Sequence, residues 1–162
     1  MTERNKLEFI VKTAAVAALY AVLTFAFSFM AYGVTQFRVS ELLTLLAFKD
    51  KRFIPGLVLG CFLSNLLSTV GWMDMIFGTL ATLIAVYLMS RTKSLFIATL
   101  WPAIINGLII GIMLYYVAGF PLAYAIFGVA LGEFVVVTLA GYPIYRYLLN
   151  REDGLLEHIS FK

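Results

Sequence analysis

Long apolar stretches separated by short polar segments make up most of the chain. A transmembrane helix needs about 20 apolar residues to cross roughly 30 Å of hydrocarbon. Five stretches meet or nearly meet this length, namely 7–31, 54–70, 74–90, 95–117 and 122–148. A sixth stretch, 38–48, would rise only about 16 Å as a regular helix. The pattern therefore predicts an all-α membrane protein, with the crossing of the short stretch to be decided by other evidence.

The basic residues favour a crossing by the short stretch. Most of them cluster next to the ends of particular apolar stretches, as Arg4, Lys6 and Lys12, then Lys49, Lys51 and Arg52, then Arg91 and Lys93, and last Arg146, Arg151 and Lys162. If 38–48 crosses, all these clusters lie on one side, and the opposite loops 32–37, 71–73 and 118–121 hold no Lys or Arg. The positive-inside rule then places both termini in the cytoplasm.

We therefore predict one integral membrane domain of six transmembrane helices, with residues 150–162 as a short cytoplasmic tail. The second helix is short, tilted or preceded by a re-entrant loop. The first stretch is too long for the apolar region of a signal peptide, so we expect a retained helix. Pro102 lies inside the fifth predicted helix and is expected to kink it.

Composition agrees with a bilayer environment. Apolar residues form 62% of the chain and charged residues 13%, and the mean hydropathy is +0.96. A soluble chain of this size has too little interior to bury so much apolar surface. These values exclude an ordinary cytosolic enzyme, a disordered chain and a nucleic-acid binder. The single Cys61 excludes an intrachain disulfide and is interpreted as a small apolar residue.

Polar side chains at membrane depth are costly and are therefore candidates for function. Glu133 lies about 18 Å below the outer end of the sixth helix, near the midplane, and Asn106 lies at similar depth in the fifth. The other polar residues lie near the side whose loops contain no Lys or Arg, namely Arg38, Glu41, Asn65 and Asp74. Aromatic residues surround them, namely Phe37, Trp72, Tyr115, Tyr116 and Phe120. The arrangement predicts an outward-facing cavity suited to a planar ligand with hydrogen-bond donors.

Structural roles compete with this interpretation. Arg38 and Glu41 have the spacing of a local ion pair at a helix start, and Asp74 could serve only as a helix N-cap. Asn65 and Asn106 could be interhelical hydrogen-bonding residues. The aromatic residues could form an ordinary interfacial belt. Glu133 has no such structural explanation.

Small residues recur at intervals of four. The glycine pairs are Gly56 and Gly60, Gly107 and Gly111, and Gly128 and Gly132, and the first helix carries Ala14, Ala17, Ala18 and Ala21. Such spacing allows close helix packing in lipid. We expect the glycines to pack the bundle itself and the alanines to form a docking face for a partner.

Other signatures are absent from the sequence. It contains no GxxxxGK[ST] phosphate loop, no HExxH motif and no Cys/His cluster, and its one histidine is His158 in the tail. We therefore expect no enzymatic activity, no catalytic residue, no metal and no cofactor.

Three motifs carry a family resemblance. They are Gln36-x-Arg38-x-x-Glu41, then Gly60-Cys61-x-x-Ser64-Asn65, and then Asp74-x-x-x-Gly78-Thr79-x-Ala81-Thr82. With the later GLIIGIMLYY and GVALGEFVVVTLAGYPIYRYLL, the chain resembles the QueT family of queuosine-precursor transporters. These are substrate-binding S components of energy-coupling factor (ECF) transporters in bacterial plasma membranes.

The resemblance implies a six-helix protein that captures a micronutrient and docks on a module of a transmembrane coupling protein and two cytoplasmic ATPases. It implies that small residues on the first helix form the docking face and that the loop 32–37 acts as a lid. The implied ligand is a 7-deazaguanine such as preQ0, preQ1 or queuine. No nucleic acid is expected as a partner.

The polar residues suit such a ligand. Glu133 could accept the N1–H and exocyclic amine of a guanine-like edge as a bidentate pair, while Asn106 or Asn65 donates to the 6-oxo group. Glu41 or Asp74 would suit an aminomethyl cation. Trp72 or Phe37 could stack on the ring, and Gln36 and Arg38 belong to the same predicted site.

Three other functions remain open at this point. The chain could be an S component for another heterocyclic vitamin or a permease that acts alone. It could also be an intramembrane enzyme that uses Glu133, Asp74 or Glu41 for acid–base chemistry.

Overall fold

The computed structural model describes residues 3–68, 70–150 and 161, and every regular element in these residues is a helix. The predicted tail 150–162 and its His158 therefore lie almost wholly outside the described residues. The first elements are α1 (Glu3–Ala26), α2 (Ser28–Ala31), the 3₁₀ helix η1 (Val39–Leu45), α3 (Leu46–Lys49) and the 3₁₀ helix η2 (Lys51–Phe53). They are followed by α4 (Ile54–Asn65), α5 (Trp72–Arg91), α6 (Leu95–Ala118), α7 (Leu122–Glu133), the π-helix η3 (Phe134–Gly141) and α8 (Tyr142–Leu149).

Within the described residues, four helices are long and apolar enough to cross a membrane. They are α1, α5, α6 and the continuous helix Leu122–Leu149 that α7, η3 and α8 form together. These helices match four of the predicted spans, and the predicted all-α class is confirmed. Pro102 lies inside α6, which continues past it to Ala118.

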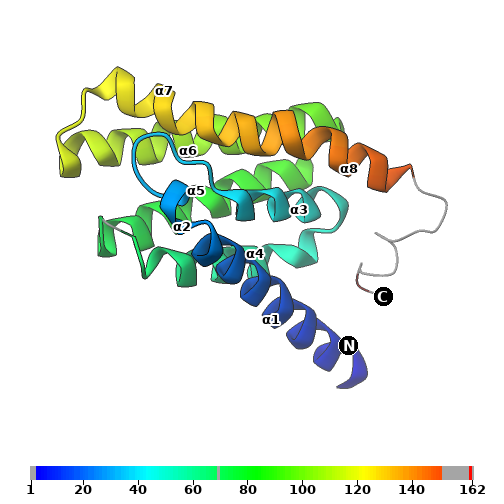
Figure 1. The fold of residues 1–162 in the computed structure, drawn as a ribbon. Helices are drawn as coiled ribbons and strands as arrows, with labels where there is room; N and C mark the ends of the chain where they lie inside the picture. The colour runs from blue at the N-terminus through cyan, green and yellow to red at the C-terminus, as the bar shows by residue number, and fades with distance from the viewer. Residues whose placement is uncertain (1–2, 69, 151–160, 162) are drawn as a thin grey trace.

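The other two predicted spans are shorter helices. The stretch 38–48 forms mainly the 3₁₀ helix η1, followed by one turn of α3. Within 54–70, α4 ends at Asn65 after 12 residues, a rise of about 18 Å. In Figure 1, α1 begins and α8 ends at the same end of the bundle. This is the arrangement that six crossings require, and the six spans and the cytoplasmic termini remain predictions.

Glycines bring the helices of the bundle into close contact. A Cβ placed on Gly60 of α4 would lie 2.6 Å from the Cβ of Tyr20 in α1. A Cβ on Gly111 of α6 would lie 2.6 Å from the Cα of Ile126 in α7. Any larger residue would therefore separate these helices, which confirms that the glycines pack the bundle.

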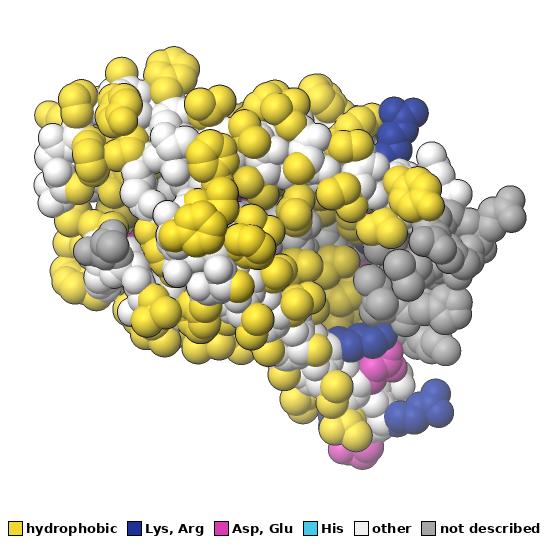
Figure 2. All heavy atoms as spheres, viewed as in Figure 1, with side chains coloured by type: hydrophobic (Ala, Val, Ile, Leu, Met, Phe, Trp, Pro, Cys, Tyr) yellow, Lys and Arg dark blue, Asp and Glu magenta, His cyan; other side chains and the backbone are white. Residues whose placement is uncertain are grey.

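The surface of the molecule separates apolar from charged side chains. In Figure 2, hydrophobic side chains cover most of the visible face, and Lys, Arg, Asp and Glu gather at the end where α1 begins and α8 ends. Large apolar side chains are exposed on the outside, for example Phe29, Phe127 and Leu139. Such a surface suits lipid rather than water.

Candidate substrate-binding site

Polar side chains from several elements of the bundle are buried in its interior. All seven of the predicted polar and charged site residues are at most 4% exposed, namely Gln36, Arg38, Glu41, Asn65, Asp74, Asn106 and Glu133. Buried polar groups of this kind are costly unless they are paired with one another or with a ligand. Their hydrogen bonds divide them into two regions.

The first region surrounds Glu41 on η1. The Tyr20 hydroxyl of α1 donates a hydrogen bond to Glu41 Oε1, and Thr82 Oγ1 of α5 lies 3.5 Å from the same oxygen. Glu41 Oε2 is buried without a hydrogen-bond partner in the described residues. We use the name Glu41 cluster for Tyr20, Arg38, Glu41, Cys61, Asn65, Asp74 and Thr82.

Arg38 is paired with Asp74 rather than with its sequence neighbour Glu41. The Nη2 atom of Arg38 lies 3.9 Å from Asp74 Oδ2, and Nη1 lies 3.8 Å from Cys61 Sγ. Among the described residues, Asp74 supplies the carboxylate within ion-pair distance of Arg38, so the alternative of a local Arg38–Glu41 pair is wrong. Asp74 is also not a helix N-cap, since Gly71, with φ +67°, occupies that position.

Asn65 links α4 to α5 within this cluster. Its Nδ2 donates to the backbone oxygen of Asp74 at 3.0 Å and contacts Cys61 Sγ at 3.5 Å, while Oδ1 stays without a partner. A Cβ on Gly78 would lie 2.7 Å from Asn65 Nδ2 and 2.9 Å from Asp74 Oδ1. The interhelical hydrogen bond proposed for Asn65 is therefore present, and a side chain on Gly78 would displace the Asn65 amide or the Asp74 carboxylate.

The second region is smaller. Asn106 Nδ2 of α6 donates to Glu133 Oε1 of α7 at 2.9 Å. Both Glu133 Oε2 and Asn106 Oδ1 are buried without partners among the residues described. We call these two residues the Glu133 pair. Glu133 interacts electrostatically with Glu41 and Arg38, so the two regions belong to one polar interior.

The local helix geometry changes directly after Glu133. This residue ends α7, and the next eight residues form the π-helix η3. π-helical turns occur frequently at functional sites, because they shift side chains out of the regular α-helical register. The amino-acid sequence carries no signal for this feature.

The loop 32–37 packs on α7 next to Glu133. Gln36 Nε2 donates to the backbone oxygen of Gly33 at 2.9 Å, which holds the loop in a turn. A Cβ on Gly132 would lie 2.2 Å from the backbone oxygen of Gln36, and one on Gly128 would lie 2.7 Å from Val34 Cγ1. The absence of a side chain at these two glycines therefore allows the loop to pack closely against α7.

The aromatic residues differ in how they are placed. Trp72 is 62% exposed and Tyr116 is 78% exposed, so both face outward. Phe37 packs against the cluster that contains Leu45 and Met89, and Phe120 packs against a second apolar cluster.

Sequence reasoning missed two tyrosines and undervalued two other residues. Tyr32 donates to the backbone oxygen of Ser64 at 2.6 Å, and its ring lies 5.8 Å from the Arg38 guanidinium carbon. Tyr20 could have been found, because it shares one face of α1 with Ala17 and Thr24. Cys61 and Thr82 stand in the quoted motifs, yet the sequence alone predicts only a small apolar residue at Cys61. Its Sγ lies 3.2 Å from Thr82 Oγ1.

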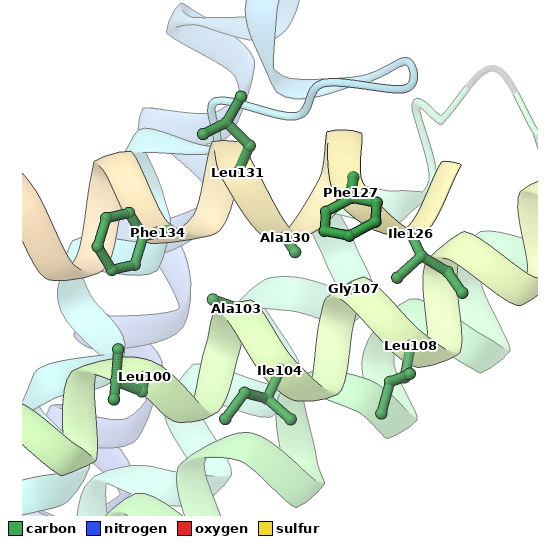
Figure 3. A pocket seen from close by; sticks show the side chains of 10 residues that line it. All are labelled: Leu100, Ala103, Ile104, Gly107, Leu108, Ile126, Phe127, Ala130, Leu131 and Phe134. Carbon is green, nitrogen blue, oxygen red and sulfur yellow. The ribbon is translucent and has the colours of Figure 1, made fainter. Parts of the chain in front are cut away.

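A separate apolar groove lies between α6 and α7 (Figure 3). Its volume is about 500 Å³, and all ten residues that line it are apolar, including Ile104, Gly107, Phe127 and Leu131. Such a lining offers no side-chain group that could recognise a polar heterocycle. Within the part of the chain that the structure describes, no three His, Cys, Asp or Glu side chains are placed to hold a metal ion.

The four alanines of the predicted docking face lie on different sides of α1. Ala17 and Ala21 are buried at 2% and 7% exposure, whereas Ala14 and Ala18 are exposed. The backbone oxygen of Ala17 lies 3.0 Å from where a Cβ on Gly60 would be placed. Ala17 therefore packs inside the bundle, and only Ala14 and Ala18 of the four lie on the outer surface.

Comparison with known proteins gives a family. A model described as QueT transporter matches residues 10–150. The chain is also 45% identical over 84 residues to a protein of Lactococcus lactis subsp. cremoris (strain MG1363), named Queuosine precursor transporter QueT. That alignment covers 51% of this chain and 49% of the relative, so the chain spans about half the length of the curated protein it matches. No solved structure matches significantly.

Proposed function

Because the chain belongs to the QueT transporter family, we propose that it is a substrate-capture subunit that binds a 7-deazaguanine queuosine precursor inside the membrane. The named relative is a queuosine precursor transporter, and the buried polar interior of this chain suits a small planar ligand with several hydrogen-bonding edges. The motifs that carry the family resemblance supply most residues of the Glu41 cluster.

The Glu133 pair is the observation that carries the proposal. Glu133 Oε2 and Asn106 Oδ1 are both buried acceptors without a hydrogen-bond partner in the described residues. A guanine-like edge offers N1–H and an exocyclic amine side by side, and a carboxylate accepts two such donors as a charge-assisted pair. In the proposed complex Glu133 accepts this edge, and the Asn106 amide reorients to donate to the 6-oxo group.

Other residues complete the proposed site. Asn65 is a second amide near the ligand, and the loop 32–37 with Gln36 and Phe37 covers it as a lid. Phe37 is better placed than Trp72 to contact a buried ring, because Trp72 is 62% exposed. Trp72 is then a residue of the entrance.

We further propose that transport requires an ECF module, made of a transmembrane coupling protein and two cytoplasmic ATPases. Of the predicted docking alanines, Ala14 and Ala18 lie on the outer surface of α1, next to the exposed Val11 and Val22. Small and apolar side chains allow close helix–helix contact in lipid. Ala17 and Ala21 support this face from within the bundle. We place the complex in the bacterial plasma membrane, with both termini of this chain in the cytoplasm.

Ligand binding by the purified protein tests the substrate. We expect the protein in mild detergent to release a 7-deazaguanine that mass spectrometry identifies, and to bind the same compound in calorimetry. Glu133→Gln removes the charge of the hydrogen bond and is expected to weaken binding by about 1.5–3 kcal/mol. Glu3→Gln is the matched control, because the Glu3 side chain is 90% exposed. Unchanged affinity of the Glu133 variant, or release of a thiamine-, riboflavin- or folate-like compound, contradicts the substrate assignment.

Reconstitution tests the mode of transport. We expect proteoliposomes to take up the ligand only when the chain is combined with the coupling protein, the two ATPases and ATP. Uptake by the chain alone would instead indicate a permease that acts by itself. Chemical turnover of the ligand by the chain alone would indicate an enzyme.

A further inference from the structure

The buried charges of the bundle do not balance. Within the described residues, the buried acidic side chains are Glu41, Asp74 and Glu133, and the buried basic side chain is Arg38. Arg38 lies within ion-pair distance of Asp74. When all four groups are ionised, three negative charges share the one positive charge among these buried described residues, and the excess negative charge is strongly unfavourable in a membrane interior.

The geometry of Glu41 leaves one oxygen available to a ligand. Its Oε1 accepts hydrogen bonds from Tyr20 on α1 and Thr82 on α5, which fixes the carboxylate from two sides. Its Oε2 is fully buried and has no hydrogen-bond partner among the described residues. Asp74 also has free oxygens, but Arg38 already supplies a positive charge beside it. Of the two acids of the Glu41 cluster, Glu41 is therefore the one with no cation within ion-pair distance in the described residues.

The second free carboxylate lies within electrostatic range. Glu133 presents its own buried Oε2 and interacts with Glu41. Two negative carboxylates repel each other, and a cation held near either of them relieves that repulsion. A neutral ligand offers no such compensation.

On the basis of the proposed function, we propose that Glu41 is a cation subsite that receives a protonated amine on the 7-substituent of the ligand. Tyr20 is its positioning residue. The site then selects amine-bearing, cationic 7-deazaguanines over neutral ones with the same ring. Glu133 recognises the guanine-like edge that both kinds of ligand share, and Glu41 discriminates between them.

Two ligands that differ only in the 7-substituent test this assignment. One is 7-aminomethyl-7-deazaguanine, which is a cation at neutral pH, and the other is 7-cyano-7-deazaguanine, which is neutral. We expect the purified wild-type protein to bind the aminomethyl compound about tenfold to a hundredfold more tightly, as a charged hydrogen bond implies. Equal affinities would overturn the cation subsite.

Variants then assign the preference to residues. Glu41→Gln is expected to lose most of the affinity for the aminomethyl compound and to keep that for the cyano compound. Tyr20→Phe keeps the carboxylate but not the hydrogen bond that orients it, and should reduce the affinity ratio about three- to tenfold. Glu133→Gln should weaken both ligands and reduce the ratio much less than Glu41→Gln does.

These outcomes separate the two proposals. If neither compound binds the wild type, the proposed substrate class fails. If both bind but Glu41→Gln leaves the ratio unchanged, only the cation subsite fails. If Glu41→Gln binds neither compound, the Tyr20→Phe variant is the deciding test. An unchanged affinity ratio of the two compounds in Tyr20→Phe overturns the cation subsite, and a reduced ratio supports it.

Discussion

The Glu41 cluster and the Glu133 pair are both buried inside the bundle, yet they are built differently. The cluster joins α1, η1, α4 and α5 with the segment that carries Arg38, and it contains an ion pair. The pair joins only α6 and α7 through one hydrogen bond between Asn106 and Glu133. The cluster thus combines many elements through mutual contacts, whereas the pair holds one carboxylate in place.

Loss of a residue is therefore expected to affect stability and ligand affinity differently in the two regions. Removing a charged member of the cluster leaves its partner charged and buried, so the free energy of unfolding is expected to fall. Removing Asn106 leaves a carboxylate with one partner fewer, so a smaller effect on stability and a direct effect on the proposed ligand are expected. The following substitutions test this contrast, from the largest expected effect to the smallest.

Arg38→Met is expected to have the largest effect on stability. It leaves Asp74 without the guanidinium 3.9 Å away, and breaking a buried ion pair from one side costs about 3–5 kcal/mol. Unfolding in detergent, followed by circular dichroism, measures the loss.

The double variant Arg38→Met with Asp74→Asn is the control for charge. It removes the orphaned carboxylate, so most of the lost stability should return. If the double variant is as unstable as Arg38→Met alone, the cost arises from packing of the Arg38 side chain and not from the buried charge of Asp74.

Asn106→Ala is expected to have an intermediate effect. It removes the donor 2.9 Å from Glu133 Oε1, and an unsatisfied buried acceptor costs about 1–3 kcal/mol. Asn65→Ala is the matched amide variant in the Glu41 cluster, where the lost bond goes to the backbone oxygen of Asp74. Calorimetry with the 7-deazaguanine should show a clear loss of affinity for Asn106→Ala. A larger loss of affinity in Asn65→Ala would reverse the proposed roles of the two regions.

Asp50→Asn is expected to have the smallest effect and provides a comparison outside the membrane interior. Partial burial opposes ionisation of Asp50, but hydrogen bonds from the Arg52 side chain and backbone outweigh it and lower the pKa of this carboxyl group. Its partner Arg52 is 44% exposed, so the pair is worth about 1 kcal/mol or less.

The effect of Asp50→Asn on stability is expected to depend on pH. A lowered pKa in the folded state means that ionised Asp50 stabilises the fold fully above the usual Asp pKa near 4. That contribution disappears as the pH falls through the lowered value. The stability difference between wild type and Asp50→Asn should therefore begin to shrink below about pH 4 and vanish only once the pH is below the lowered pKa. A difference that persists in acid would contradict the electrostatic origin.

The sequence was a good guide to the fold and to the residue types of the site. Long apolar stretches located the four long helices, and the cost of polar residues at membrane depth identified six of the seven buried polar and charged site residues. The seventh, Gln36, came from the family motifs. The family match over residues 10–150 confirms the resemblance drawn from the motifs. These features are local, because each depends on one stretch of chain and on its environment.

The pairing of the side chains was harder to predict. Sequence spacing placed Arg38 beside Glu41, but the nearest carboxylate in the bundle is that of Asp74 on α5. The role of Tyr20 depends on how α1 packs against η1, and the buried side of α1 depends on Gly60 of α4. Such contacts join distant parts of the chain, and no local pattern encodes them.

The π-helix η3 has a consequence for chain length that its apolar composition conceals. A π-helical turn holds about one residue more than an α-helical turn. Deleting a single residue from Phe134–Gly141 would therefore allow this segment to become an ordinary α-helix while the residues after it keep roughly their direction relative to Glu133. Tyr145, which is buried beyond this segment, would then stay close to its present packing. A one-residue deletion should therefore be tolerated better here than in the regular part of α7, where all that follows would rotate by about 100°.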